Sequence, residues 1–199
     1  MRRLVVATGN AGKLREIRAL LPKERVEWVG LAEFSPSVAV DFPDEGDDYR
    51  SNALAKARAV AEQLGEAAVA DDSGLEVDAL GGRPGPHSAR YGGPGLDDSG
   101  RVARLLEELA GVEPAQRGAR FVCHAALVFP DGRSECVVGV CDGVILLEPT
   151  GGEGFGYDPV FQPRGEACAM AELSAARKNQ ISHRARAFER LAQTSSWGS

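Results

Sequence analysis

The stretch VVATGNAGKLREIRALL, residues 5–21, decides the fold class, because an apolar run passes through a short turn into an amphipathic segment. The apolar run predicts a buried β-strand over residues 3–8. The spacing of leucine and isoleucine after the turn predicts a helix over residues 12–21. A strand followed closely by a helix is a βα unit, and such units build parallel sheets.

A long hairpin is the clearest feature of the second half of the chain. Residues 119–146, ARFVCHAALVFPDGRSECVVGVCDGVIL, predict two strands joined at Pro130-Asp131-Gly132. Hairpin strands are antiparallel, whereas βα units give parallel pairs. Together they predict an α/β protein with a mixed sheet.

Three further segments have helical patterns. The first covers about residues 51–65, where Ser51 or Asn52 is a candidate N-cap and Gly65 ends the helix. The second covers about residues 99–110, with apolar residues at helical spacing on one face. The third is the helical stretch that carries KNQISHRARAFERL near the end of the sequence.

Composition places the chain among ordinary globular proteins. Of its 199 residues, 43% are hydrophobic and 26% are charged, and the length suits one large domain or two closely packed lobes. No apolar run approaches the roughly 18 residues of a membrane span, and the first one is too short for the core of a signal peptide. We therefore expect a single domain over residues 1–199, in the cytoplasm and not bound to a membrane.

The net charge of −6 argues against a general nucleic-acid-binding protein, which needs a basic face. The four cysteines show no C-x-x-C spacing, so reduced thiols are expected rather than a thiolate metal site. If the ligand is a phosphate compound, positive charge must come from local groups. A divalent cation is the simplest supplier of that charge.

The turn at residues 8–13 resembles a phosphate-binding loop but fails the Walker pattern at both ends. That pattern needs a glycine at position 7 and a hydroxyl residue after the lysine. Here the residues are Ala7 and, after Lys13, Leu14. The dinucleotide-binding pattern fails too, because Gly9 and Gly12 are the only glycines in the turn.

The same turn still has features of a phosphate site. Thr8, Gly9 and Asn10 follow the end of a strand, where α/β sheets bind ligands. Backbone N–H groups at the start of the next helix, together with Lys13, could hold a polyphosphate. The alternative is a plain turn with a surface lysine.

Two adjacent carboxylates, Asp71 and Asp72, come directly after the apolar strand AAVA. Consecutive residues of a strand point to opposite faces, so the two are not expected to share one task. One is a candidate to bind metal or activate water, and the other to fix the loop by hydrogen bonds. The alternative is that DDSG is simply a turn.

An acidic loop precedes the helix at residues 51–65. It is a candidate source of a further metal ligand, because oxygen ligands without clustered histidine or cysteine favour Mg²⁺ over Zn²⁺. The alternative is a solvated run of charge. The acidic residues are Asp41, Asp44, Glu45, Asp47 and Asp48.

Two later motifs suggest contacts to a planar ligand. In GEGFGYDP, Phe155 and Tyr157 could stack on a base or tuck into the core. In Ser182-His183-Arg184 the serine is a candidate N-cap, which places two cations in the first turn of a helix. The helix dipole disfavours cations there, so an anion or a carbonyl-rich ligand is expected to face them.

The order of these motifs is more specific than any one of them. TGN-x-x-K, the acidic loop, S-N-A-x-x-K-A, A-D-D-S-G-L, P-G-x-x-S-A-R-Y, G-F-G-Y-D-P and K-x-x-I-S-H-R follow one another along the chain. This order resembles the inosine/xanthosine triphosphate pyrophosphatase family. The resemblance runs from Val5 to about Leu191.

The resemblance implies a two-lobed α/β fold around a long mixed sheet flanked by helices, with an active-site cleft between the lobes. It also implies a homodimer and a Mg²⁺-dependent enzyme. The implied substrates are deaminated purine nucleoside triphosphates (ITP, dITP and XTP), which are hydrolysed to the monophosphate and pyrophosphate. This reaction removes them from the nucleotide pool.

The resemblance also assigns roles to residues. Asp72 is implied to be the general base and a metal ligand. The family glutamate that binds metal stands two residues before the glycine, where this chain has Asp44 with Glu45 beside it, so either is a candidate. His87 also departs from the family pattern, without an expected consequence. The implied substrate contacts are Thr8, Gly9, Asn10, Ala11, Gly12, Lys13, Ser73, Phe155, Gly156, Tyr157, Asp158, Lys178, His183 and Arg184.

Two other functions stay open at this point. One is a pyrophosphatase for modified pyrimidine or methylated nucleotides on a related fold. The other is a nucleotide sensor without catalytic activity. A panel of substrates distinguishes the first alternative from the expected function. Hydrolysis of a bound nucleotide distinguishes the expected enzyme from the sensor.

Overall fold

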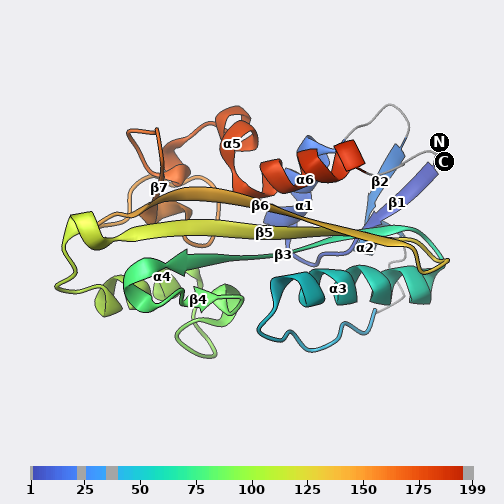
Figure 1. The fold of residues 1–199 in the computed structure, drawn as a ribbon, viewed down its shortest axis with the longest axis horizontal. Helices are drawn as coiled ribbons and strands as arrows, with labels where there is room; N and C mark the ends of the chain where they lie inside the picture. Colours follow the sequence, from blue (N-terminus) through green and yellow to red (C-terminus); the bar gives the residue numbers. More distant parts are fainter. Residues whose placement is uncertain (1, 22–25, 35–39, 195–199) are drawn as a thin grey trace. The chain divides into compact units, whose positions relative to one another are not determined.

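The structure, a computed structural model, describes residues 2–21, 26–34 and 40–194 as a mixed α/β fold (Figure 1). Its contacts divide the chain into two compact units. The first unit contains Met1–Asp72, Cys123–Gly139 and His183–Ser199. The second contains Ser73–Val122 and Val140–Ser182. The expected single domain over residues 1–199 stays a prediction.

In the described part of the chain, the strands form a seven-stranded sheet in the order β2-β1-β3-β5-β6-β7, with β4 paired to β3 beside this path. Strand β1 is parallel to β2 and to β3, whereas β6 and β7 are antiparallel. The predicted mixed α/β sheet is therefore confirmed. The strands are β1 Arg2–Val6, β2 Val26–Gly30, β3 Ala68–Val77, β4 Pro84–Gly85, β5 Gly118–Val128, β6 Ser134–Ile145 and β7 Phe161–Pro163.

The predicted hairpin is β5 and β6. Its turn is closed by the N–H of Phe129, which donates to the carbonyl of Arg133 over 2.9 Å. Gly132 stands in the turn with φ of 88°, a left-handed conformation that glycine adopts without a steric penalty. The residues expected at the turn, Pro130-Asp131-Gly132, lie between the two strands as predicted.

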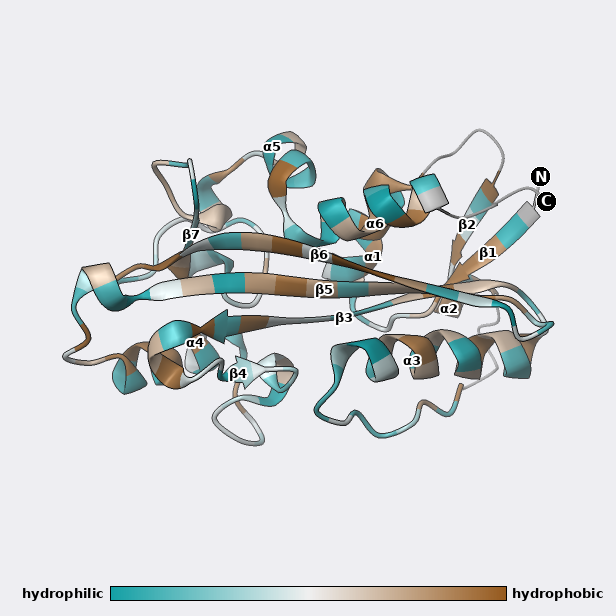
Figure 2. Cartoon of the chain, in the orientation of Figure 1, coloured by the Kyte–Doolittle hydropathy of each residue, from teal (hydrophilic) through white to brown (hydrophobic). Residues whose placement is uncertain are grey.

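The three predicted helical segments are confirmed to within a few residues, and the last one is divided in two at Ser182. Gly65 ends α3 in the left-handed conformation, as expected. In Figure 2, α3 carries both hydrophilic and hydrophobic residues along its length, as a helix with one buried face should. The helices are α1 Ala11–Leu20, α2 Leu31–Phe34, α3 Tyr49–Leu64, α4 Asp98–Glu108, α5 Ala175–Ile181 and α6 His183–Thr194.

The predicted N-cap of α3 is wrong. The helix begins at Tyr49, and Asp48 is its N-cap, accepting a hydrogen bond from the N–H of Ser51 over 2.8 Å. Asp48 is as good a capping residue as Ser51 or Asn52, and it stands three residues ahead of Ser51, at the spacing that capping requires. Asn52 therefore lies inside the helix, where its side chain is available for other contacts.

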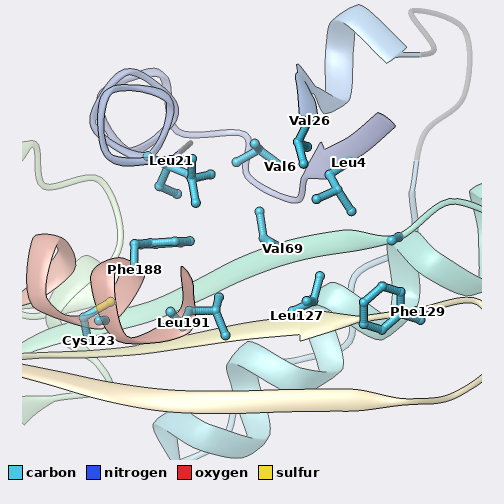
Figure 3. Packing of buried hydrophobic residues seen from close by; sticks show 14 residues of the cluster. Leu4, Val6, Leu21, Val26, Val69, Cys123, Leu127, Phe129, Phe188 and Leu191 are labelled. Carbon is cyan, nitrogen blue, oxygen red and sulfur yellow. The ribbon is translucent and has the colours of Figure 1, made fainter. Parts of the chain in front are cut away.

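In the first unit, alternate strand residues pack against helices on opposite faces of the sheet. Leu4, Val6 and Val69 belong to a cluster with Ile17 of α1 and Phe188 of α6. Figure 3 shows these strand residues and Phe188 facing the same apolar space. The intervening residues Val5, Ala68 and Ala70 pack instead against α3, through Ala53, Ala57 and Val60. Over residues 68–70 of β3, the two-residue period of a strand thus directs alternate side chains to different helices.

The docking of α6 depends on one glycine of β6. A Cβ at Gly139 would collide with the carbonyl oxygen of His183 and the backbone nitrogen of Ala187. Only glycine therefore lets the α6 backbone approach β6 this closely. The result places the start of α6, with His183 and Arg184, against the sheet.

The second unit has its own apolar core. Phe121 of β5 contacts Phe161 of β7 edge to face at 4.6 Å between ring centroids. Leu105 of α4 and the C-cap residue Leu109 pack in the same cluster. Arg117 is buried there and donates to three backbone carbonyls, of Leu109, Val112 and Leu146. These bonds link the C-cap of α4, at Leu109, to the loop that follows it and to the residue after β6.

None of the four cysteines forms a disulfide bond, in agreement with the reduced thiols that the sequence predicts. Cys123 and Cys141 are buried, and Cys136 and Cys168 are partly buried. Among the helices of the described residues, none is long and apolar enough to cross a membrane.

Candidate active site

Asp71 and Asp72 lie on opposite faces of β3, as predicted. Asp71 points to the face covered by α1 and α6, and it forms an ion pair with Arg184. Asp72 points to the face covered by α3, and it forms an ion pair with Lys56. Both carboxylates are buried. Two neighbouring carboxylates thus belong to two separate polar clusters of the first unit.

The Asp71 cluster joins α1 and α6. The carboxylate of Asp71 accepts from the Nη2 of Arg184 at 3.0 Å and lies 3.1 Å from the Nζ of Lys13. Glu16 accepts from the Nη1 of Arg184. Burial lowers the pKa of the Arg184 guanidinium, but Asp71 and Glu16 outweigh it and hold that pKa above its ordinary value. Arg184 is therefore a fixed, buried cation.

The Asp72 cluster joins β3, α3 and the acidic loop. The Nζ of Lys56 lies 2.8 Å from Oδ1 of Asp72 and also forms an ion pair with Glu45. The Nδ2 of Asn52 donates to Oδ2 of Asp72 over 3.0 Å. Both carboxylate oxygens of Asp72 therefore have a donor.

Burial sets the acidity of this cluster. It raises the pKa of the Asp72 carboxyl above its usual value and outweighs the opposing effect of Lys56, Asn52 and Lys13. Burial also disfavours the charged form of Lys56, but its pairs with Asp72 and Glu45 together raise its pKa. A carboxylate whose pKa is raised is a stronger base toward water than an ordinary exposed aspartate.

The side chain of Asn52 connects α3 to the acidic loop by two hydrogen bonds with the backbone of Gly46. Its Oδ1 accepts from the N–H of Gly46 at 2.8 Å, and its Nδ2 donates to the carbonyl of Gly46 at 3.0 Å. Glu45, next to Gly46, is thereby placed beside Lys56. Asp44 is exposed, whereas Glu45 is partly buried. Of the two candidate metal ligands, Glu45 is the one that the structure brings to Asp72.

The chemistry of this cluster fits a divalent cation. The ammonium of Lys56 lies between the carboxylates of Glu45 and Asp72, so a cation is already accommodated by this pair. Within residues 2–21, 26–34 and 40–194, no group of three or more His, Cys, Asp or Glu side chains gathers as a metal site. Mg²⁺ often binds through one or two carboxylates, with substrate phosphates and water as the other ligands.

The turn at residues 8–13 uses its side chains locally. Asn10 is the N-cap of α1 and accepts from the N–H of Lys13 over 3.0 Å. Thr8 Oγ1 accepts from the N–H of Asn10 at 3.2 Å. Lys13 is brought to Asp71. Contacts from Thr8, Gly9, Asn10, Ala11, Gly12 and Lys13 to a phosphate stay predictions.

A third cluster lies in the second unit, around the glycine-aromatic loop. The buried carboxylate of Asp158 accepts from the N–H of Phe155 at 2.9 Å and from Nζ of Lys178 at 2.5 Å. The same Nζ lies 5.1 Å from the centroid of the Phe155 ring. Gly154 has φ of 81°, and a Cβ there would collide with Asp158. Three predicted substrate contacts, Phe155, Asp158 and Lys178, are thus in mutual contact.

The two aromatic residues of this loop differ in burial. Tyr157 is 4% exposed, and its hydroxyl donates to the carbonyl of Ser88 over 2.9 Å. Phe155 is only partly buried. Tyr157 therefore anchors the loop in the core, and Phe155 is the aromatic face with access to solvent.

His183 and Arg184 do begin a helix, as predicted, with Ser182 immediately before it. Both are buried, His183 to 5% exposure. Arg184 donates to Asp71 through Nε and Nη2 and to Glu16 through Nη1. For Arg184, the expected anion is therefore a carboxylate of the protein, that of Asp71 or Glu16. Their contact with a base, and that of Ser73, stays a prediction.

The sequence interpretation missed Lys56 and Asn52. They stand four residues apart in S-N-A-x-x-K and therefore share one face of α3. The two-residue period of β3 turns Asp72 toward that same helix. These two periodicities together were a usable signal for both residues.

The fold and these clusters define an α/β protein with two buried carboxylate–cation centres in its first unit. The model of the Ham1 family matches residues 4–194, and the chain belongs to this family. The dITP/XTP pyrophosphatase of Geobacillus kaustophilus is 48% identical over 191 residues, covering 96% of this chain and 93% of that protein. The dITP/XTP pyrophosphatase of Streptomyces avermitilis is 49% identical over 193 residues, with 96% of each chain covered.

Solved structures give the same result. A HAM1 protein from Coxiella burnetii superimposes with a TM-score of 0.85 at 38% identity, covering 97% of this chain and 98% of the other. A nucleoside-triphosphatase, dITP/XTP pyrophosphatase, from Mycobacterium abscessus gives a TM-score of 0.75 at 43% identity, covering 95% and 98%. The resemblance found in the sequence is confirmed.

Proposed function

We propose that this chain hydrolyses the deaminated purine nucleoside triphosphates ITP, dITP and XTP to the monophosphate and pyrophosphate. The observation that carries the proposal is the buried Asp72 carboxylate, held between Lys56 and Asn52. Its raised pKa suits a general base. Membership of the Ham1 family and the names of its relatives support the substrate class.

In this proposal Asp72 takes a proton from the attacking water. The water oxygen forms a bond to the α-phosphorus, the bond to the bridging oxygen of the β-phosphate breaks, and pyrophosphate leaves with that oxygen. The proton remains on Asp72 until it is passed to solvent. Help from a positioned general base contributes typically about 10²–10⁴-fold to such a rate.

The proposal uses the ammonium groups of Lys13 and Lys56 to neutralise the triphosphate, and it is supported by the effect of both on Asp72, since each of them lowers the pKa of that carboxyl. Lys13 is held by Asp71, and Lys56 is held by Asp72 and Glu45. Glu45 and Asp72 are the residues that would hold Mg²⁺. When bound, the ion supplies charge neutralisation on the phosphates and orientation of the reacting groups.

For the base, the proposal keeps two contacts that the resemblance implies, one at Phe155 and one at His183. Phe155 offers a stacking face, and His183 is a candidate donor to the 6-oxo group of hypoxanthine or xanthine. Adenine has an amino donor at that position, so it would leave the donor unpaired, a mismatch that polar sites reject by up to about 10⁴–10⁵. All three donating nitrogens of Arg184 already bind carboxylates, which supports a role for it in holding Asp71 and Glu16.

The proposal includes a homodimer, as the resemblance implies, and a cytoplasmic location. The presence of four cysteines without a disulfide bond supports a reducing compartment. Sedimentation of the purified chain at several concentrations tests the dimer. A monomer at all concentrations would remove this part of the proposal without affecting the activity.

A substrate panel tests the function. ITP, dITP, XTP, GTP, ATP and dTTP are each supplied at equal concentration with Mg²⁺, and released pyrophosphate is measured. The expected result is turnover of the three deaminated purines far above the others. A preference for dTTP would contradict the proposal, as would binding of ITP without hydrolysis.

A further inference from the structure

The loop that carries Phe155 is tied to helix α4 by one hydrogen bond. Oδ2 of Asp98, in the first turn of α4, accepts from the backbone N–H of Gly156 over 2.7 Å. Gly156 stands between Phe155 and Tyr157, and its φ of 63° is left-handed. The bond therefore holds the chain at the residue that follows the partly buried Phe155.

Asp98 is available for this contact because its neighbour caps the helix. Asp97 accepts from the N–H of Gly100 at 2.8 Å, which satisfies the helix start. Oδ1 of Asp98 accepts from Nη1 of Arg101 over 3.1 Å, one turn further along α4. Arg101 thus fixes the rotamer of Asp98, so that Oδ2 faces the loop.

Consecutive N–H groups of the loop are bound by two different carboxylates. Phe155 N–H is bound by Asp158, which belongs to the loop itself and also binds Lys178. Gly156 N–H is bound by Asp98, which comes from outside the loop. Asp158 is among the predicted substrate contacts, whereas Asp98 is not. Its side chain is 54% exposed, so its loss leaves no cavity in the core.

We infer that Asp98 is a positioning residue, which sets the orientation of the Phe155 ring through the backbone of Gly156. This inference rests on the proposed function, because it takes Phe155 to be the stacking face for the base. A hydrogen bond to a charged acceptor is among the stronger ones in proteins, and it also restricts the left-handed residue that follows Phe155. Its loss is expected to weaken nucleotide binding and leave the chemistry at Asp72 unchanged.

Three variants separate positioning from general helix stability. Asp98→Ala removes the acceptor, and Asp98→Asn keeps an oxygen that can accept from Gly156. Asp97→Ala is the matched control, because it removes the N-cap of the same helix without touching the loop. For each, kcat and KM for ITP are measured, together with amide hydrogen exchange of the peptide that contains residues 154–158.

The expected result for Asp98→Ala is a KM for ITP raised about tenfold with kcat nearly unchanged, and faster exchange of the loop peptide. Asp98→Asn should return KM to within about threefold of wild type. Asp97→Ala should lower the melting temperature but leave KM and loop exchange as in wild type. Equal KM values for Asp98→Ala and Asp97→Ala would overturn the inference, as would unchanged loop exchange in Asp98→Ala.

Failure of the proposed function is visible separately. It shows as absence of pyrophosphate release from ITP by the wild-type chain, before any variant is compared. The exchange measurement needs no substrate, so unchanged exchange in Asp98→Ala would still overturn the inference in that case.

Discussion

Asp71 and Asp72 are neighbours in β3, yet their carboxylates bind cations on opposite faces of the sheet. Asp71 pairs with Arg184 of α6, and Asp72 pairs with Lys56 of α3. Because a strand alternates its side chains, the motif ADDSG supplies one carboxylate to each face. In the proposed function Asp72 does the chemistry, and Asp71 supports the fold through its pair with the buried Arg184.

The first prediction compares the stability of Asp71→Asn and Asp72→Asn. Asp71→Asn keeps an oxygen but removes the negative charge that faces two cations, Lys13 and the buried Arg184, so the free energy of unfolding should fall by about 3 kcal/mol. Asp72→Asn retains an oxygen that accepts from Lys56, and Lys56 keeps Glu45, so the loss should be about 1 kcal/mol or less. Urea denaturation at neutral pH measures both. Equal losses would contradict the division of roles.

Lys56 should matter for turnover through its charge. Lys56→Met removes the ammonium that Asp72 and Glu45 hold, and we expect kcat for ITP to fall by about a hundredfold. Lys56→Arg keeps a positive charge and should retain more of the activity. Steady-state pyrophosphate release measures both variants, after circular dichroism has shown that each is folded. Wild-type kcat in Lys56→Met would remove this residue from the site.

Glu45, rather than Asp44, should determine the response to the metal. Glu45→Gln should shift the Mg²⁺ concentration for half-maximal activity upward by about tenfold or more, since one of two carboxylate ligands is lost. Asp44→Asn, a matched change in an exposed neighbour, should shift it little. Binding of Mn²⁺ to the substrate-free protein, followed by electron paramagnetic resonance, checks the same ranking without turnover. The reverse ranking would assign the metal to Asp44.

Gly139→Ala should be strongly destabilising. The added Cβ meets backbone atoms of His183 and Ala187, which cannot move aside as a flexible side chain would. Overpacking costs typically about 1–3 kcal/mol, and a collision with backbone belongs at the upper end. Gly152→Ala is the control, because nothing lies near its added Cβ. Thermal denaturation of the two variants tests whether α6 approaches β6 as described.

The hydroxyl of Tyr91 should lose its proton at a higher pH than an ordinary tyrosine. Burial, and then its hydrogen bond to Glu108, raises the pKa of the Tyr91 hydroxyl from 10.0 to about 12. The folded state therefore holds this proton more tightly than the unfolded state. Its contribution to stability is complete below about pH 10 and is lost as the pH rises through about 12. Alkaline titration of phenolate absorbance in wild type and Tyr91→Phe measures it, and a Tyr91 step near pH 10 would contradict the burial.

Much of the fold follows from periodicity in the sequence. The strand–helix order of residues 5–21 and the hairpin at residues 119–146 both predicted observed elements, because local patterns determine them. The N-cap of α3 was predicted wrongly, because Asp48, Ser51 and Asn52 are all good caps and local preference does not rank them. The choice of Asp48 leaves Asn52 free to bind Gly46 and Asp72, contacts that come from elsewhere in the chain.

For the candidate site, the sequence predicts how the two carboxylates of β3 are oriented but not which residues they contact. The opposite faces of Asp71 and Asp72 follow from strand geometry alone. The partners of each carboxylate do not, because Arg184 lies 113 residues from Asp71 in the sequence and is brought there by the packing of α6. Tertiary packing also brings Glu16 to Arg184. The position of Arg184 in the first turn of a helix therefore predicts a nearby anion, but it does not predict that Asp71 and Glu16 supply it.

The most direct test of the central claim is pyrophosphate release from ITP by Asp72→Asn, compared with wild type in the presence of Mg²⁺. ITP binding to each protein is measured in parallel by isothermal titration calorimetry. The predicted result is loss of turnover by at least about a hundredfold with ITP binding retained. Hydrolysis by Asp72→Asn at the wild-type rate would contradict the account, because the water would then be activated elsewhere.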